Sequence, residues 1–230
     1  MAFGEDFLGD RHAVLMQARD VLRTRVIAVA PNAQVGIEDR AALFVWLPAG
    51  THDQVDRVKR AAESAGRLEL LEVAGPAEHA AYYASESVPE GYDVLKCWDA
   101  VAPEHGITDR LLVAKFPIVR EADFTSVTAE GDSRGWMLVC RLNPEAAKRF
   151  DDAAARAFAM SPRGLIAIIK DGHVQSVPQV SSERFGGELE ITGGFDETTA
   201  KGLAAILRSG RLPFPLKLAA ERVVDRSLPK

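Results

Sequence analysis

The chain has 230 residues, 47% of them hydrophobic and 27% charged, so it is long and apolar enough for one large globular domain or two smaller ones. Its formal net charge of −5 argues against a nucleic-acid partner, because such proteins carry a basic surface. No run reaches the ~18 apolar residues of a membrane span, and residues 1–6 show neither the basic start nor the apolar stretch of a signal peptide.

The first 75 residues alternate between helical and strand patterns. The predicted elements are a helix over 12–30, strands over 33–37 and 41–47, a helix over 51–66 and a strand over 67–73. Thr51 and Gln54 form a capping-box pattern at the start of the second helix. This order predicts an α+β sandwich with helices on one face of an antiparallel sheet, in which 41–47 is a central strand.

The next stretch carries turn-forming residues and little periodicity. Prolines and glycines interrupt any regular pattern at Pro76, Pro89, Gly91, Pro103 and Gly106. We interpret residues 76–108 as a connector. A stretch of this length without elements is unusual in a compact domain, which favours a hinge region.

Regular patterns return after residue 108. Strands are predicted over 111–116 and 136–142, separated by a polar loop. Asn143 is placed to cap the following helix and Pro144 to occupy its first position, where the missing N–H has no cost.

A hairpin, a further strand and a helix are predicted next. Asp171-Gly172 lies between apolar strands at 164–170 and 173–180, and Gly accepts the positive φ of a type I′ turn. The glycine pairs at 186–187 and 193–194 fit neither G-x-G-x-x-G nor a P-loop, so we interpret them as turns and tight joins. Asp196 is placed to cap the last helix, which Gly210 ends.

Four blocks in this half resemble the extracytoplasmic P1 region of SecD, the accessory subunit of the bacterial Sec protein-export machinery. They are L-N-P-E-A-A-K-R-F at 142–150, D-G-H-V-Q-S-V-P at 171–178, I-T-G-G-F at 191–195 and L-R-S-G-R-L-P-F-P at 207–215. In the first half, V-L-R-T-R-V at 21–26, V-W-L-P-A-G at 45–50 and R-L-E-L-L-E-V at 67–73 are also similar to that family.

The resemblance implies a ferredoxin-like base sandwich, built from residues 1–75 and 215–230 and completed by a C-terminal strand over 216–224. It places an α+β head subdomain at 76–214, including the connector. It further implies a non-enzymatic export module that binds unfolded preprotein at the trans side of the Sec translocon, with the head pivoting on the base. The expected partners are preprotein, the translocon and the SecD/SecF membrane part, at the extracytoplasmic face of the membrane.

Two sets of residues are candidates for this function. Prolines restrict φ and element ends absorb motion, so the predicted hinge residues are Gly75, Pro76, Leu212, Pro213 and Pro215. An exposed strand edge of the head is expected to bind extended chain by β-augmentation, with Arg184 and Phe185 in an adjacent loop.

Reactive centres are not expected. The histidines match no metal or catalytic spacing and are predicted to lie on the surface; they are His12, His52, His79, His105 and His173. Cys97 and Cys140 fit no zinc or redox motif and are expected to be buried thiols, a disulfide being the alternative. We therefore predict no catalytic residue, no cofactor, no metal and no enzymatic activity.

Two alternatives remain open at this point. The family's D-L-x-G-G strand has no counterpart before His12, and the chain stops at Lys230, so it is either a fragment or a soluble relative. A stand-alone soluble adaptor with another partner, in the cytoplasm, agrees with the missing signal peptide. A hydrolase or transferase that uses Cys97 is the third hypothesis.

Overall fold

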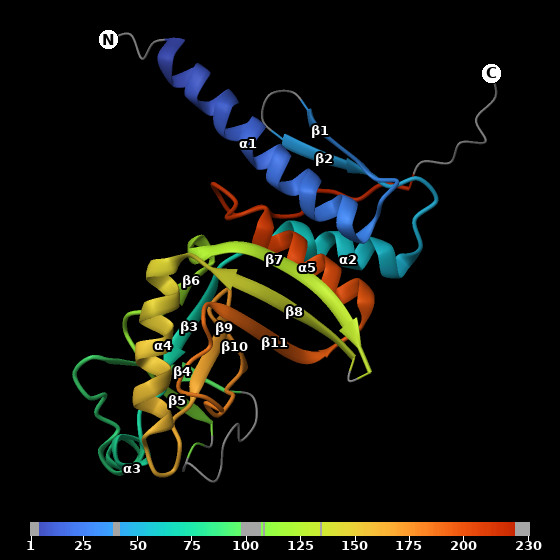
Figure 1. Cartoon of the computed structure of the whole chain (residues 1–230). Coiled ribbons are helices and arrows are strands. Elements are labelled where there is room, and N and C mark those ends of the chain that lie inside the picture. The colour runs from blue at the N-terminus through green and yellow to red at the C-terminus, as the bar shows by residue number, and fades with distance from the viewer. Residues whose placement is uncertain (1–4, 39–41, 98–106, 108, 134, 224–230) are drawn as a thin grey trace, which may run out of the picture. The chain divides into compact units, whose positions relative to one another are not determined.

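The chain folds into two compact units. The computed structural model describes residues 5–38, 42–97, 107, 109–133 and 135–223. Unit 1 consists of residues 1–65 and 212–230, and unit 2 of residues 66–211 (Figure 1). The chain therefore crosses between the units twice, after Ala65 and after Arg211. The first crossing lies ten residues before the boundary expected at residue 75.

Unit 1 is built on two helices and a hairpin. Helix α1 (Glu5–Val29) contacts both α2 (His52–Glu63) and β1 (Gln34–Glu38), which pairs with β2 (Ala42–Trp46). The buried side of α1 carries the apolar residues Ala18, Val21, Leu22, Val26 and Val29, together with the guanidinium of Arg25. The capping box at the start of α2 is confirmed: the Thr51 side chain accepts from the Gln54 N–H, and the Gln54 side chain accepts from the Thr51 N–H.

Two strand predictions in unit 1 are corrected. The 41–47 run is not a central strand, because β2 belongs to a two-stranded sheet and its Phe44 is 45% exposed. The C-terminal strand expected over 216–224 is not formed in residues 216–223, and Val224 lies outside the described residues. This segment exposes Leu218 and Val223, and Ala, Glu and Lys are poor strand formers. A ferredoxin-like sheet completed by the tail is therefore absent from the described part of unit 1.

Unit 2 contains two larger antiparallel sheets and a β-ribbon. The first has the order β10-β9-β3-β6, formed by His173–Ser176, Ile166–Lys170, Leu68–Glu72 and Val119–Arg120. The second has the order β11-β8-β7, formed by Glu188–Phe195, Gly135–Leu142 and Phe124–Asp132 (Figure 1). The ribbon pairs β4 (Tyr92–Lys96) with β5 (Arg110–Ala114). Helices and antiparallel sheets together confirm the α+β class.

Strand β3 was predicted in the first subdomain but pairs entirely within unit 2. It lies between β9 and β6, with Leu70 opposite Ile168 on one side and Val119 on the other. Alternate side chains of β9 serve two cores: Ile166 and Ile168 join one apolar cluster, and Ala167 and Ile169 join the other. Burial on both faces explains the nearly continuous apolar run of β9.

Two described helices pack on the larger sheets, and a short 3-10 helix joins a strand of one sheet to a strand of the other. Helix α4 (Pro144–Phe158) contacts β6 and β8, and α5 (Glu197–Arg208) packs on the β11-β8-β7 sheet, mainly over β7 (Figure 1). Their predicted caps are confirmed, because Asn143 Oδ1 accepts from the Ala146 N–H at 2.8 Å and Asp196 Oδ1 from the Thr199 N–H at 2.7 Å. The 3-10 helix η2 (Glu121–Asp123) joins β6 to β7.

The connector prediction was wrong for its first part. Residues 76–85 form helix α3 (Pro76–Ser85), and β4 follows from Tyr92; residues 98–106 and 108 lie outside the described part. The sequence pattern did not predict α3, because this helix is short and the described residue that it buries is polar, so no apolar stripe marks it. His79 is fully buried, and its Nε2 accepts from the Leu112 N–H at 3.1 Å. The prediction that His79 lies on the surface is therefore also wrong.

Candidate functional site

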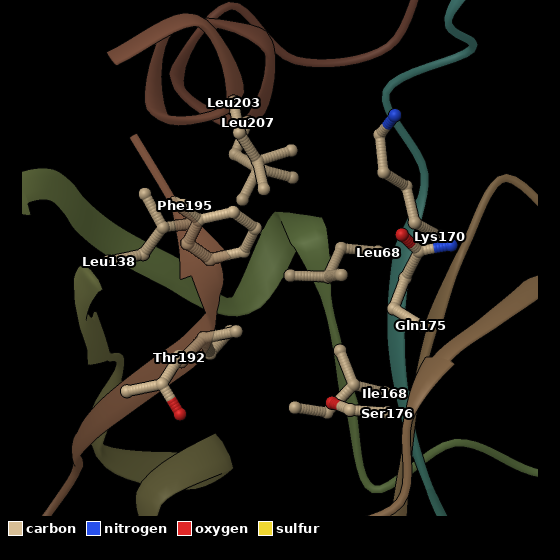
Figure 2. A pocket seen from close by; sticks show the side chains of 11 residues that line it. Leu68, Leu138, Ile168, Lys170, Gln175, Ser176, Thr192, Phe195, Leu203 and Leu207 are labelled. Carbon is tan, nitrogen blue, oxygen red and sulfur yellow. The ribbon is translucent and has the colours of Figure 1, made fainter. Parts of the chain in front are cut away.

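An apolar pocket lies between the two larger sheets of unit 2. Its volume is about 90 Å³. Leu203 and Leu207 of α5 close one end, Leu138, Thr192 and Phe195 form one wall, and Leu68, Ile168, Lys170, Gln175 and Ser176 form the other (Figure 2). Ile191 of β11 also lines the pocket. Gln175 and Thr192 are exposed, so the pocket opens to solvent between β10 and β11.

Both strands at this opening are the outermost strands of their sheets. β10 ends the order β10-β9-β3-β6, and β11 ends the order β11-β8-β7. An outermost strand presents backbone N–H and C=O groups that no second strand of its sheet can satisfy. The described part of unit 2 thus places two strand edges beside one apolar pocket.

Each of these strands is bulged at the pocket. The register of β10 shifts between Val174 and Ser176, and that of β11 shifts between Thr192 and Phe195. The second shift contains the glycine pair 193–194, where Gly194 adopts φ +64°, a left-handed conformation that favours glycine. The bulge turns Phe195 into the pocket wall, and Asp196 then caps α5 (Figure 2). This glycine pair is therefore structural, as the sequence predicted.

The pocket has an apolar floor and a polar rim. Leu68, Leu138 and Ile168 are at most 8% exposed, whereas the rim carries the Ser176 and Thr192 hydroxyls, the Gln175 amide and the Lys170 ammonium. Lys170 Nζ lies 3.8 Å from Asp171 Oδ2, so an acidic group faces the positive charge there. Such a site can bury one apolar side chain of a bound segment, and its polar rim can form hydrogen bonds with the backbone of that segment. The residues that line it do not place a nucleophile beside a base.

The residues predicted to bind peptide lie elsewhere. Phe185 is half-buried, meets Phe150 edge-on with ring centroids 5.2 Å apart, and donates its N–H to Asp151 Oδ1 at 2.8 Å. Arg184 is exposed beside it, and neither residue lines the pocket. The pocket-lining residues were missed because six elements contribute them. The one local signal was a glycine pair that interrupts strand alternation.

The predicted hinge residues fall in different places. Gly75 is the N-cap of α3 and Pro76 its first residue, so both lie inside unit 2 rather than at a crossing. Leu212 begins the return segment of unit 1, where its N–H donates to the Ala65 carbonyl at 3.4 Å. Pro213 and Pro215 follow in the same segment, which forms neither helix nor strand up to residue 223.

The two thiols are buried and unpaired, as expected. Burial, with a smaller contribution from Asp109, raises the pKa of Cys97, and burial raises the pKa of Cys140 to about 12. Both groups are therefore protonated at neutral pH, which is the opposite of what a nucleophilic cysteine needs.

The described residues hold neither a metal-ligand cluster nor a membrane-spanning helix. They contain no cluster of three or more His, Cys, Asp or Glu side chains suited to a metal ion. Of the remaining histidines, His12, His52 and His173 are exposed, and His105 lies outside the described residues. No described helix is both long and apolar enough to cross a bilayer.

Curated relatives of this chain are protein translocase subunits SecD. The chain is 37% identical to SecD of Acidaminococcus fermentans over 107 residues, which is 46% of this chain and 25% of that protein. It is 36% identical to SecD of Streptomyces coelicolor over 109 residues, covering 47% of this chain and 18% of that protein. With SecD of Aquifex aeolicus the identity is 32% over 131 residues, or 56% of this chain and 25% of the relative. The chain therefore spans a quarter or less of the length of these relatives.

Solved structures give the same fold. A crystal structure of SecDF in its super-membrane-facing form matches with a TM-score of 0.60 and 24% identity, over 90% of this chain and 28% of that one. A structure of SecDF, described as a membrane component that enhances protein export, matches with a TM-score of 0.58 and 24% identity, over 92% of this chain and 94% of that one.

A family model matches most of unit 2, from residue 99 onward. The model of the SecDF P1 head subdomain matches residues 99–214, which is half of the chain. This range includes the walls of the pocket from Leu138 to Leu207. The chain therefore belongs to the SecDF family, and it carries the P1 head subdomain.

Proposed function

We propose that this chain is a protein-export module whose unit 2 binds unfolded polypeptide at the pocket between β10 and β11. The observation that carries the proposal is the placement of two outermost strands beside one apolar pocket. An unfolded chain has free backbone groups and exposed apolar side chains, and this site is suited to both. A folded protein has already paired and buried these groups, so it is not a substrate.

Binding takes place by β-augmentation. An extended segment adds to the edge of β11 or β10 through main-chain hydrogen bonds, which do not depend on its sequence. Every second side chain of the segment points to the same face, so one of them can enter the pocket. About 90 Å³ is smaller than the ~150 Å³ apolar cavity known to hold benzene, so the pocket suits one aliphatic side chain rather than an aromatic ring.

We also propose where this chain acts and with which partners. The SecD relatives are protein translocase subunits, and the SecDF structure with the same fold is described as a membrane component that enhances export. We place the chain at the extracytoplasmic face of the membrane, with the Sec translocon and the SecD/SecF membrane part as partners. Unit 2 acts as a head that pivots on a base formed by unit 1, and neither unit contributes a catalytic group.

Site-specific photo-crosslinking tests the binding proposal. A benzophenone amino acid replaces Gln175 at the rim of the pocket, or Lys148 on the exposed face of α4 as the control position. The purified chain is mixed with an unfolded presecretory protein or with a folded protein. We expect crosslinks from position 175 to the unfolded protein only. Equal crosslinking to both proteins, or equal crosslinking from both positions, would contradict the proposal.

A matched pair of variants tests the pocket itself. Thr192→Lys adds a charge at the mouth of the pocket, and Ser126→Lys adds the same charge on β7, at the opposite edge of the same sheet. Burial of one aliphatic side chain is worth about 1.5–3 kcal/mol, so Thr192→Lys should weaken binding about tenfold or more. Ser126→Lys should change it less than about twofold. Equal losses would show that the added charge, and not the pocket, decides affinity.

A further inference from the structure

Helix α3 lies along the edge of β5 that does not pair with β4. On this edge, Leu112 donates its N–H to His79 Nε2 at 3.1 Å, and its carbonyl accepts from the Ala74 N–H at 3.0 Å. Two residues earlier, Arg110 donates its N–H to Tyr83 Oη at 3.3 Å, and its carbonyl accepts from the same hydroxyl at 2.9 Å. His79 and Tyr83 are four residues apart, so they share one face of α3. These two side chains supply bonds that a neighbouring strand would otherwise give to β5.

The bonds of His79 fix the tautomer of its imidazole. A backbone N–H can only donate, so Nε2 is the acceptor in the bond from Leu112 and carries no proton. Nδ1 lies 3.1 Å from the Gly75 carbonyl, which can only accept, so Nδ1 carries the proton. The ring is fully buried. The contact between α3 and β5 therefore requires a neutral imidazole with its hydrogen on Nδ1.

Protonation of His79 is incompatible with this contact. An imidazolium donates from both nitrogens, so its Nε2–H would face the Leu112 N–H, and two donors would meet inside the protein. The positive charge would be buried as well, and burial disfavours the charged form of a side chain. Histidine is the side chain that ordinarily changes its charge between pH 5 and 8, so the Tyr83 bonds do not respond directly in this range.

Several charged or titratable groups lie on α3 and on the elements beside it. They are Glu78 on α3, Asp109 and Arg110 at the start of β5, Tyr92, Asp93 and Lys96 on β4, and Glu72 on β3. Burial raises the pKa of Tyr92, and the charges of Glu78 and Glu72 add to this effect, so these carboxylates act near the ribbon. Carboxylates favour an imidazolium and therefore influence the pH at which it forms. They do not remove the clash between its Nε2–H and the Leu112 N–H.

We propose that His79 makes a pH-sensitive contact, which holds α3 on β5 while the imidazole is neutral and releases it on protonation. Once released, the imidazole is in water, where histidine titrates near ~6.5. The open form then binds a proton that the closed form does not accommodate, so the closed form is lost as the pH falls below this value. Opening uncovers the edge of β5 and loosens the β4–β5 ribbon over the apolar cluster that contains Cys97. This device does not depend on polypeptide binding.

Thiol labelling measures the opening, because Cys97 and Cys140 lie in different apolar clusters of unit 2. The whole chain is treated between pH 7.5 and pH 5 with 4,4′-dithiodipyridine, and each rate is divided by that of a free thiol at the same pH. We expect the corrected rate at Cys97 to rise about tenfold or more on acidification, while Cys140 stays protected. Equal acceleration at both thiols would show global acid unfolding, and an unchanged rate at Cys97 would show no opening; either result would overturn the proposal.

A matched pair of variants assigns the response to one histidine. His79→Gln keeps an acceptor for the Leu112 N–H but does not titrate, so labelling of Cys97 should stay slow at every pH. His173→Gln replaces an exposed histidine of unit 2 and should keep the native pH dependence. A folded His79→Gln variant with the native pH dependence would overturn the proposal.

Nuclear magnetic resonance of the native chain keeps the test decisive if His79→Gln does not fold. The imidazole nitrogens of His79 should show the Nδ1–H tautomer at pH 7.5. Amide exchange at Leu112, corrected for its intrinsic pH dependence, should become faster as His79 is protonated. A different tautomer, or corrected exchange that does not change with pH, would contradict the proposal.

Discussion

Units 1 and 2 are stabilised in different ways. Two clusters of buried apolar side chains lie entirely within unit 2, where α4 and α5 pack on two antiparallel sheets. Unit 1 joins two helices to a hairpin, and its largest fully buried side chain is the guanidinium of Arg25. An isolated hairpin is marginal in water, so β1 and β2 depend on α1. Unit 2 should therefore unfold as a cooperative body, whereas unit 1 should depend more strongly on single contacts such as those of Arg25.

The largest expected effect is a cavity in unit 2. Phe150 of α4 is 5% exposed and contacts Phe185. Phe150→Ala should lower the free energy of unfolding of unit 2 by about 3–5 kcal/mol, through lost burial and the cavity left behind. Cys97 and Cys140 both lie buried in unit 2, so their labelling by a thiol reagent should become faster. Phe116→Ala, at an 80% exposed residue, is the control and should change stability by less than about 0.5 kcal/mol.

The next effect concerns unit 1 alone. Arg25→Gln removes charged donors from buried carbonyls and should destabilise unit 1 by about 2–3 kcal/mol. Circular dichroism should show part of the helical signal lost at lower urea concentration, while thiol labelling in unit 2 keeps its native rate. If thiol labelling becomes faster at the same urea concentrations at which helical signal is lost, the two units unfold together. This result would contradict the view that they are stabilised separately.

A helix cap in unit 2 should have a smaller effect. Asn143 Oδ1 accepts the Ala146 N–H, so Asn143→Ala should cost about 1 kcal/mol of unit 2 stability in urea unfolding. Asn143→Asp keeps an acceptor at the cap and should lose less. A loss by Asn143→Asp as large as that of Asn143→Ala would show that the cap bond is not the cause.

The smallest effect is a pH dependence that belongs to unit 2. Burial alone would raise the pKa of Asp123, but bonds from the Arg120 N–H and the Arg149 guanidinium outweigh it, so this pKa lies below its ordinary value. A lowered folded-state pKa contributes stability above the unfolded pKa of about 3.9, and this contribution is lost as the pH falls through the folded value. Urea unfolding between pH 5 and pH 2 should show the loss.

Asp123→Asn is the matched control for this pH dependence. It should be less stable than the native chain at pH 5 and should lose less stability on acidification. Parallel curves for the two proteins would assign the acid sensitivity to other carboxylates.

Local patterns of residues were enough to predict several helices and turns. Helices α4 and α5 carry their own caps at Asn143 and Asp196, and the structure confirms both. Asp171 and Gly172 adopt φ +51° and +83°, the positive angles of the predicted hairpin turn. The motif blocks around them identified the family. These features need only neighbouring residues, because caps and tight turns are decided by backbone groups within a few positions.

The pairing of strands into sheets and the place of the pocket depend on contacts between distant residues, and the sequence did not predict them. β3 pairs with strands about 50 and 100 residues further on, so its own pattern could not assign it to unit 2. β7 carries many polar side chains and still pairs with β8 from Phe124 to Asp132, whereas residues 216–223 pair with no described strand. The pocket joins side chains from six elements between two sheet edges. Such pairings depend on long-range burial, which a local pattern of residues does not record.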